Sequence, residues 1–159
     1  QRVSSLALLG STVPMLVSEP LLNAAQQNNH SAIDMITLWA HSLSSHIGGR
    51  GTPGLSVASG SLRLLEKAAP GVLYADLFAC NAYQAGLDNA AKLRCPVLLL
   101  QGQHDMMTPP RSTKKLVAAL AQSTATVQTT VLPGCGHMMF AEQPNQTLER
   151  LFDFFSGQI

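Results

Sequence analysis

The sequence has few charges and no excess of either sign. Of its 159 residues only 12% are charged, the formal net charge is +1 and 46% of the residues are hydrophobic. Disordered chains have the opposite composition, so we expect a folded chain with a sizeable core. A balanced charge also provides no field that would attract nucleic acid or an anionic membrane, and neither is expected as a partner.

Cysteines are few, and signals for membrane insertion or export are missing. Cys80, Cys95 and Cys135 are odd in number and widely spaced, without a C-x-x-C pair, so they predict neither a disulfide framework nor a metal site. We expect Cys135 to be a small buried residue. No hydrophobic run is long enough to span a membrane, and no signal-peptide pattern is present. A cytoplasmic location is therefore expected.

Three segments have the pattern of strands in a parallel sheet. Residues 3–9 form a short apolar run, residues 95–100 form a continuous one of the kind that is buried on both faces, and a third runs from about 126 to 132. With helical patterns between them, these strands predict an α/β fold, a parallel sheet flanked by helices. A strand so close to Gln1, which is not a methionine, needs a sheet partner, so we expect further sequence upstream.

The remaining segments have helical spacing. Ser31 and Asp34 form a capping-box pattern at the start of a helix that carries Trp39 on its apolar face. Thr108 is expected to cap a short helix that begins at the following proline. The last helix begins near Glu142, whose charge is expected to favour the helix N-terminus. Further helices are predicted over 61–69 and 72–87, and a mobile loop over 46–54. The helix over 72–87 carries Leu73, Leu77, Phe78 and Ala82 on one side. The last helix is expected to pack on the sheet through Leu148, Leu151, Phe152 and Phe155.

Two residues with acid–base chemistry follow the second and third predicted strands. Asp105 lies in a polar turn after one strand and His137 in a glycine-rich turn after the next. The carboxyl ends of parallel strands meet at one edge of a sheet, so the two side chains are expected to lie close together. A histidine that acts as a general base needs a carboxylate to orient it. Gly134 and Gly136 allow a sharp turn that points the ring inward.

The residues around this pair resemble a known family. The sequences PVLLLQGQHDMMTP (96–109) and PGCGHMMFAEQP (133–144) look like the C-terminal part of an α/β-hydrolase, and DLFACNAY (76–83) is similar to a segment of its lactonase-like and esterase-like members. By this resemblance, Asp105 is the acid and His137 the base of a catalytic triad. The resemblance also implies a hydrolase core over 1–12 and 93–159 and a helical cap inserted over 13–92.

The family's nucleophile elbow, G-x-S-x-G, is absent from this chain. The order Ser, Asp, His places the nucleophile upstream of Gln1. The resemblance therefore implies an incomplete fold with about three strands, the C-terminal portion of an enzyme that hydrolyses a small carboxylic ester or lactone by a Ser-His-Asp mechanism. Neither a metal nor an organic cofactor is implied. The missing N-terminal half or a second copy of the chain is the expected partner, and this chain alone is expected to be inactive.

Two alternatives to an ester or lactone hydrolase with a serine nucleophile remain open. An aspartate in place of the serine would make the protein similar to epoxide hydrolases and haloalkane dehalogenases. A truncated or ligand-binding chain without catalysis is the third possibility.

Methionines surround both catalytic turns, and such side chains adapt to irregular apolar pockets. We expect Met138, beside the histidine, and Trp39 to contact the substrate.

Overall fold

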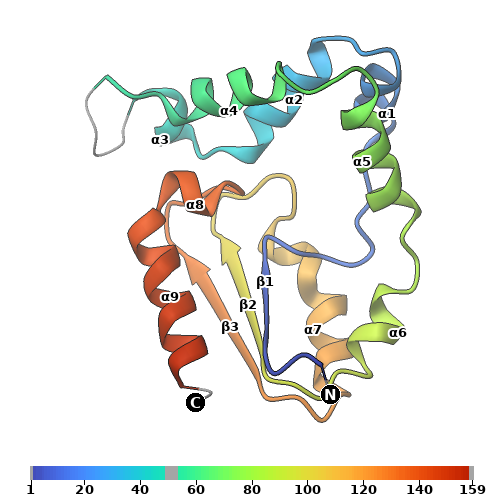
Figure 1. The fold of residues 1–159 in the computed structure, drawn as a ribbon, viewed down its shortest axis with the longest axis vertical. Coiled ribbons are helices and arrows are strands. Elements are labelled where there is room, and N and C mark those ends of the chain that lie inside the picture. Colours follow the sequence, from blue (N-terminus) through green and yellow to red (C-terminus); the bar gives the residue numbers. More distant parts are fainter. Residues whose placement is uncertain (1, 49–53, 158–159) are drawn as a thin grey trace.

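The computed structural model describes residues 2–48 and 54–157, which are organised around one parallel sheet (Figure 1). Its strands are β1 (Leu6–Leu9), β2 (Val97–Gly102) and β3 (Val127–Leu132), and they are hydrogen-bonded in the order β1-β2-β3. The predicted incomplete α/β fold with three parallel strands is thus confirmed. Each observed strand lies within a few residues of its predicted range.

The central strand β2 carries the core on both of its faces. All six of its residues are buried, as the continuous apolar run predicted. Leu99 lies between Leu8 and Thr129 of the neighbouring strands. Successive side chains of a strand point to opposite faces, so Leu98 and Leu99 belong to two different hydrophobic clusters.

Helices cover both faces of the sheet, and a further group of helices lies beyond the carboxyl ends of its strands. They are α1 (Glu19–Gln26), α2 (Ser31–Ala40), α3 (Leu43–His46), α4 (Val57–Leu65), α5 (Val72–Ala82), α6 (Gly86–Ala90), α7 (Lys114–Ala121), α8 (Met139–Glu142) and α9 (Pro144–Ser156), with a 3₁₀ turn at Pro110–Thr113. α6 and α7 lie on one face of the sheet, and α8 and α9 lie on the other (Figure 1). α1 to α5 form a separate group, here called the helical layer, past the carboxyl ends of the strands.

The start of α2 differs from the predicted capping box. Ser31 is already the first residue of the helix, and His30 stands at the cap position without a side-chain cap. The N–H of Ser31 instead donates to Oδ1 of Asn29 at 3.0 Å. The carboxylate of Asp34 lies 3.2 Å from Nδ1 of His30, the residue at the cap position. The helix is therefore confirmed, whereas the predicted cap is wrong.

Two other helices differ from their predicted bounds. α4 begins four residues earlier than expected, because the side chain of Ser56 accepts a hydrogen bond from the N–H of Ser59 and starts the helix there. The single helix predicted over 72–87 is divided into α5 and α6. At the start of α6 the backbone of Gly86 packs against Val13, where a Cβ atom would lie 2.7 Å from the valine side chain.

The terminal helix α9 is confirmed, but its predicted buried face is wrong. It buries Phe154 and Thr147 against the sheet side and Leu151 in part, whereas Leu148 and Phe152 are about two-thirds exposed. The helix is apolar on two sides, and only one of them faces the three described strands. Phe155 of the same predicted face is also exposed.

Two sequence predictions concern the loop and the membrane. The mobile loop predicted over 46–54 falls mainly on residues 49–53, which lie outside the described residues. In the two described ranges, no helix has both the length and the hydrophobicity needed to cross a membrane.

Candidate active site

Asp105 lies in the turn after β2 and is almost fully buried, with 2% of its surface exposed. Its Oδ1 atom accepts hydrogen bonds from the backbone N–H groups of Met107 and Thr108, both at 2.8 Å. Its Oδ2 atom lies 2.8 Å from Nδ1 of His137. The carboxylate is therefore held in one plane, with one oxygen directed at the imidazole ring, as an acid that orients a histidine requires.

The turn after β3 brings His137 to this acid. Gly134 has a φ of +66°, a left-handed conformation that glycine adopts without strain, as the sequence indicated. Gly136 serves a different purpose. A Cβ atom there would lie 2.8 Å from O of Ala40 and 2.7 Å from N of Ser42. Its missing side chain lets the turn approach the end of α2, where the N–H of His137 donates to O of Ala40 at 2.8 Å.

The contact between His137 and Asp105 decides which ring nitrogen is available for chemistry. An ionised carboxylate only accepts hydrogen bonds, so Nδ1 carries the proton and Nε2 keeps its lone pair. Burial by itself would raise the pKa of Asp105, but hydrogen bonds from His137 and Thr108 and the charge of the protonated ring outweigh burial and hold that pKa below its usual value. Asp105 is therefore ionised at neutral pH and can stabilise an imidazolium.

The lowered pKa of Asp105 predicts an acid-dependent loss of stability. The Asp105 carboxylate takes up a proton more readily in the unfolded chain than in the folded one. Its contribution to the free energy of unfolding is therefore complete above the unfolded-state pKa of about 3.9, and it is lost as the pH falls through the lower folded-state pKa. Asp105→Asn lacks this contribution at every pH. Urea unfolding from about pH 5 to pH 2 should therefore show a steeper loss for the wild type than for the variant. Parallel curves would contradict the prediction.

Thr108 and Gly10 complete the surroundings of the pair, and the sequence analysis missed both. The hydroxyl of Thr108 lies 2.8 Å from Oδ2 of Asp105 and 2.7 Å from O of Gly10. Gly10 has a φ of +54° and lies against the His137 ring, where a Cβ atom would be 2.8 Å from Cε1. The predicted helix cap by Thr108 is wrong because the hydroxyl makes these contacts, and the 3₁₀ turn begins only at Pro110. The only sequence signals were a threonine three residues after the acid and a glycine after a strand.

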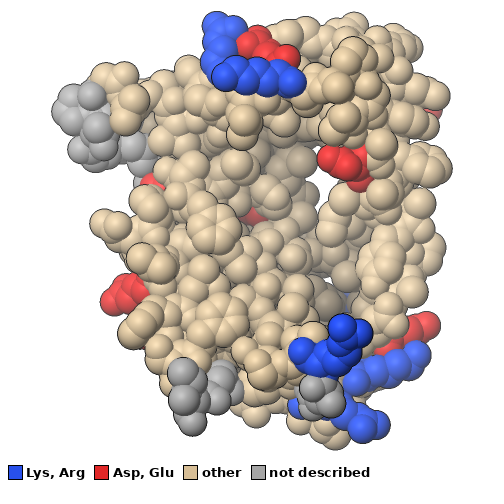
Figure 2. Space-filling model, in the orientation of Figure 1, with Lys and Arg blue, Asp and Glu red and all other residues tan. Residues whose placement is uncertain are grey.

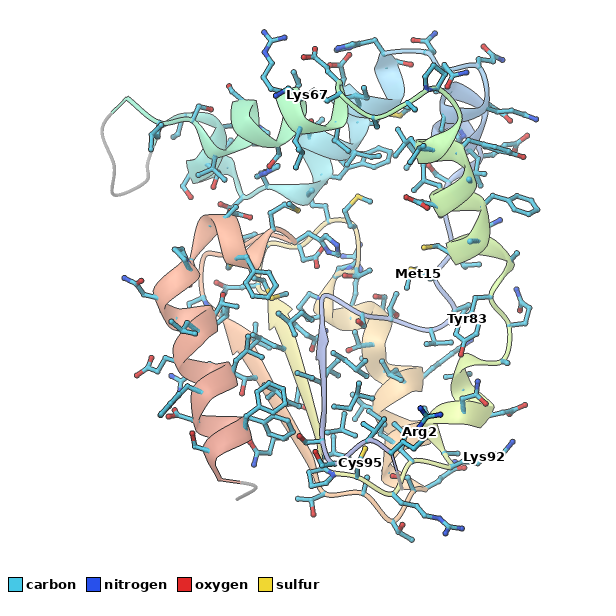
Figure 3. The ribbon with its side chains drawn as sticks, viewed as in Figure 1. Arg2, Met15, Lys67, Tyr83, Lys92 and Cys95 are labelled. Atoms are coloured by element: carbon cyan, nitrogen blue, oxygen red, sulfur yellow. The ribbon has the colours of Figure 1, made fainter. Side chains whose placement is uncertain are left out.

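A cavity of about 550 Å³ adjoins His137 and extends between the sheet and the helical layer. Figure 2 shows this side of the molecule hollowed beside α5, with lysines and arginines gathered at the two far ends of the face. Figure 3 shows Met15 directed into the same opening. Of the described residues that line the cavity, none is Lys, Arg, Asp or Glu. Its hydrophobic lining includes Met15, Leu21, Trp39, Leu77, Met106 and Met107.

The two predicted pocket residues have different positions. Trp39 lines the cavity from the end of α2. Met138 does not line it, because this residue leads into α8 and its N–H donates to O of Ala40 at 3.1 Å. The methionines that form the cavity wall next to the acid turn are Met106 and Met107. Contact of Met138 and Trp39 with the substrate stays a prediction.

Two further residues near the histidine turn were assigned from the sequence. Cys135 is fully buried and packs with the hydrophobic cluster that contains Leu132 and Phe154, as predicted. Glu142 was expected to be a charge at a helix start, and it lies in the single turn of α8, two residues before α9 begins. It is the last residue of α8 and is only 4% exposed. Its carboxylate accepts hydrogen bonds from the N–H groups of Ser42 and Gly136. Within the described part of the chain, no group of three or more His, Cys, Asp or Glu side chains could hold a metal ion.

Comparison with known protein families identifies the class of protein to which this fold belongs. A family model described as serine aminopeptidase, S33, matches residues 65–144, which is half of the chain. The chain belongs to this family of α/β-hydrolases. A comparison with curated proteins found no match.

Solved structures share the same fold at low sequence identity. An esterase from Thermogutta terrifontis is 20% identical with a TM-score of 0.78, and the alignment covers 99% of this chain and 57% of that one. For an esterase from Exiguobacterium antarcticum these values are 16%, 0.76, 97% and 57%. For Est816, described as an N-acyl homoserine lactone degrading enzyme, they are 18%, 0.74, 97% and 59%. The chain thus spans less than two-thirds of the length of these structures.

Proposed function

We propose that the complete protein hydrolyses a small, uncharged carboxylic ester or lactone by a Ser-His-Asp mechanism. The observation that carries this proposal is the 2.8 Å contact between Nδ1 of His137 and the buried Asp105, beside a cavity without charged lining among the described residues. The family description supports a serine hydrolase, and the similar esterases and lactone-degrading enzyme support an ester or lactone as the substrate.

In the proposed reaction, a serine outside this chain attacks the carbonyl carbon of the substrate and Nε2 of His137 takes the serine proton. The protonated ring, stabilised by Asp105, then gives this proton to the leaving alcohol oxygen. Water attacks the acyl-enzyme, His137 takes a proton from the water, and the serine regains it as the acid is released. Asp105 orients the ring throughout and keeps its charge.

The composition of the cavity wall favours an ester over a peptide with a free amino end. A protonated amino group that loses water needs a carboxylate partner, since an unpaired buried charge is costly. The described lining offers hydrophobic side chains and a few neutral polar groups instead. An apolar acyl group gains free energy from the same wall, and methionines adapt to its shape.

We also propose that the sequence upstream of Gln1 supplies the nucleophile and completes the sheet. β1 stands at one edge of the three-stranded sheet, and Leu148 and Phe152 of α9 are exposed on the outer side of the terminal helix. The alignments cover only 57% and 59% of two of the solved relatives, so these proteins contain a large segment that has no counterpart in this chain. The helical layer then acts as a cap over the site, and the 159-residue chain by itself lacks activity.

The test has two steps. The coding sequence upstream of Gln1 should contain G-x-S-x-G after a strand pattern. The complete protein should then hydrolyse p-nitrophenyl esters and simple lactones at least about tenfold faster, in kcat/KM, than an aminoacyl p-nitroanilide, a difference of about 1.4 kcal/mol. An aspartate in the elbow, with turnover of epoxides or haloalkanes, would overturn the serine mechanism. A preference for the aminoacyl substrate would overturn the substrate class.

A further inference from the structure

Glu142 is a buried carboxylate that joins two segments far apart in the sequence. Its Oε2 atom accepts hydrogen bonds from the N–H of Ser42 at 3.0 Å and from the hydroxyl of Ser45 at 2.8 Å, and the Ser42 hydroxyl donates to the same oxygen. Its Oε1 atom accepts from the N–H of Gly136 at 3.0 Å. One oxygen therefore binds the start of α3 and the other binds the histidine turn.

The carboxylate is suited to this double contact. All four of these bonds run from donors to carboxylate oxygens, which is the pattern an ionised carboxyl group satisfies. A buried charge is expensive unless hydrogen bonds compensate it, and bonds to a charged acceptor are stronger than neutral ones. A neutral side chain of the same shape could not accept at both oxygens. This arrangement therefore requires glutamate for its charge as well as for its length.

The segment that Glu142 holds is the one that positions His137. Gly136 directly precedes the histidine, and the N–H of His137 donates to O of Ala40 at 2.8 Å. The acid turn is attached to the same part of the helical layer, because the N–H of Met106 donates to O of Trp39 at 3.3 Å. The end of α2 thus contacts both catalytic turns, and Glu142 adds the bonds that fix the histidine turn to it.

We infer that Glu142 is a positioning residue that fixes the ring of His137 by bonding the histidine turn to Ser42 and Ser45 at the start of α3. The inference rests on the role of His137 as the base proposed above. Glu142 is not among the residues that line the cavity beside His137, so its effect should appear in the rate of the chemical step and leave substrate binding almost unchanged. A misplacement of about 1 Å can lower a rate about 100-fold.

The inference is tested in the complete protein with Glu142→Gln. An amide has one accepting oxygen and one donating NH₂ group, so either the N–H of Gly136 or the donors of Ser42 and Ser45 would face another donor. We expect kcat for a p-nitrophenyl ester to fall about 10- to 100-fold, with KM within about twofold of the wild type. Ser45→Ala removes a single donor and should lower kcat by a smaller factor, which keeps the test valid if Glu142→Gln does not fold.

A spectroscopic measurement makes the test independent of turnover. The Nδ1 proton of His137 lies in a hydrogen bond to Asp105 and should give a downfield proton resonance, identified by its loss in Asp105→Asn. Glu142→Gln should shift or broaden this resonance. Glu149→Gln, which makes the same chemical change at an exposed site on α9, should leave both the resonance and kcat unchanged.

Each outcome has a separate meaning. A folded Glu142→Gln protein whose kcat or resonance equals that of the wild type would overturn the inference. A lower melting temperature with an unchanged kcat per folded molecule would show a merely structural role and would overturn it as well. If the wild-type protein hydrolyses no ester, the proposed function fails, while the resonance still decides whether Glu142 positions the ring.

Discussion

Replacing His137 with alanine in the complete protein should lower kcat for a p-nitrophenyl ester about 10⁴-fold or more while the fold is retained. Among the described residues, the ring supplies the only side-chain nitrogen that is both oriented by the buried Asp105 and adjacent to the cavity. Its side chain is 30% exposed, so its removal leaves no closed void in the core. Asp105 would keep its backbone donors at Met107 and Thr108. Steady-state kinetics and circular dichroism measure the two effects.

A matched control for this variant lies within the acid turn. His104 is exposed, directly precedes Asp105 and is not among the residues that line the cavity beside His137. His104→Ala should therefore retain kcat within about threefold, a change of roughly 0.7 kcal/mol in the barrier. Comparable losses in both variants, or retained activity in His137→Ala, would remove His137 from the mechanism and with it the proposed triad.

Replacing Gly102 with alanine should destabilise the protein by about 3 kcal/mol or more. Gly102 ends β2, and a Cβ atom there would lie 2.0 Å from O of Gly136 and 2.7 Å from O of Cys135. Both atoms belong to the backbone of the histidine turn, so no flexible side chain can move aside. Either the turn must shift away from the strand or the strand must bend. Urea unfolding measures the change in the free energy of unfolding. Steady-state kinetics should also show a lower kcat, because His137 moves with its turn.

Gly60→Ala is the control for this prediction. Gly60 lies within α4, has no atom within 4 Å of the position a Cβ would take, and is exposed. Alanine favours a helix over glycine by about 1 kcal/mol, so this variant should be slightly more stable than the wild type. If Gly102→Ala were as stable as the wild type, the close approach of β2 and the histidine turn would not be a feature of the folded protein.

Local patterns in the sequence were sufficient to predict the framework. The apolar run at β2, the polar turn with Asp105 and the glycine turn with His137 predicted three parallel strands and a pair of side chains at their carboxyl ends. This worked because strand burial and turn formation depend on neighbouring residues, and because parallel strands end at one edge of the sheet. The observed contact between His137 and Asp105 agrees with the expectation that these side chains lie close together.

The helix boundaries and the pocket wall were predicted less well. Ser31 matches a capping box, yet Asn29 bonds to the helix start, and Met138 stands next to the histidine but leads into α8 instead of lining the cavity. Each pattern has several physical solutions with similar local free energy, and packing selects among them. The exposed side of α9 shows the same effect, because its helical period indicates two apolar stripes without indicating which one meets the described sheet.

By itself, the sequence determined the fold class, the parallel strands, and the proximity of Asp105 and His137. The tertiary structure alone decided that Thr108 contacts Gly10, that Gly136 needs space for α2, and that Glu142 accepts from Ser42. Thr108 and Gly10 are 98 residues apart, and Glu142 and Ser42 are 100 residues apart. Contacts of this kind have no local period or motif, because they form only when the helical layer and the two turns meet in space.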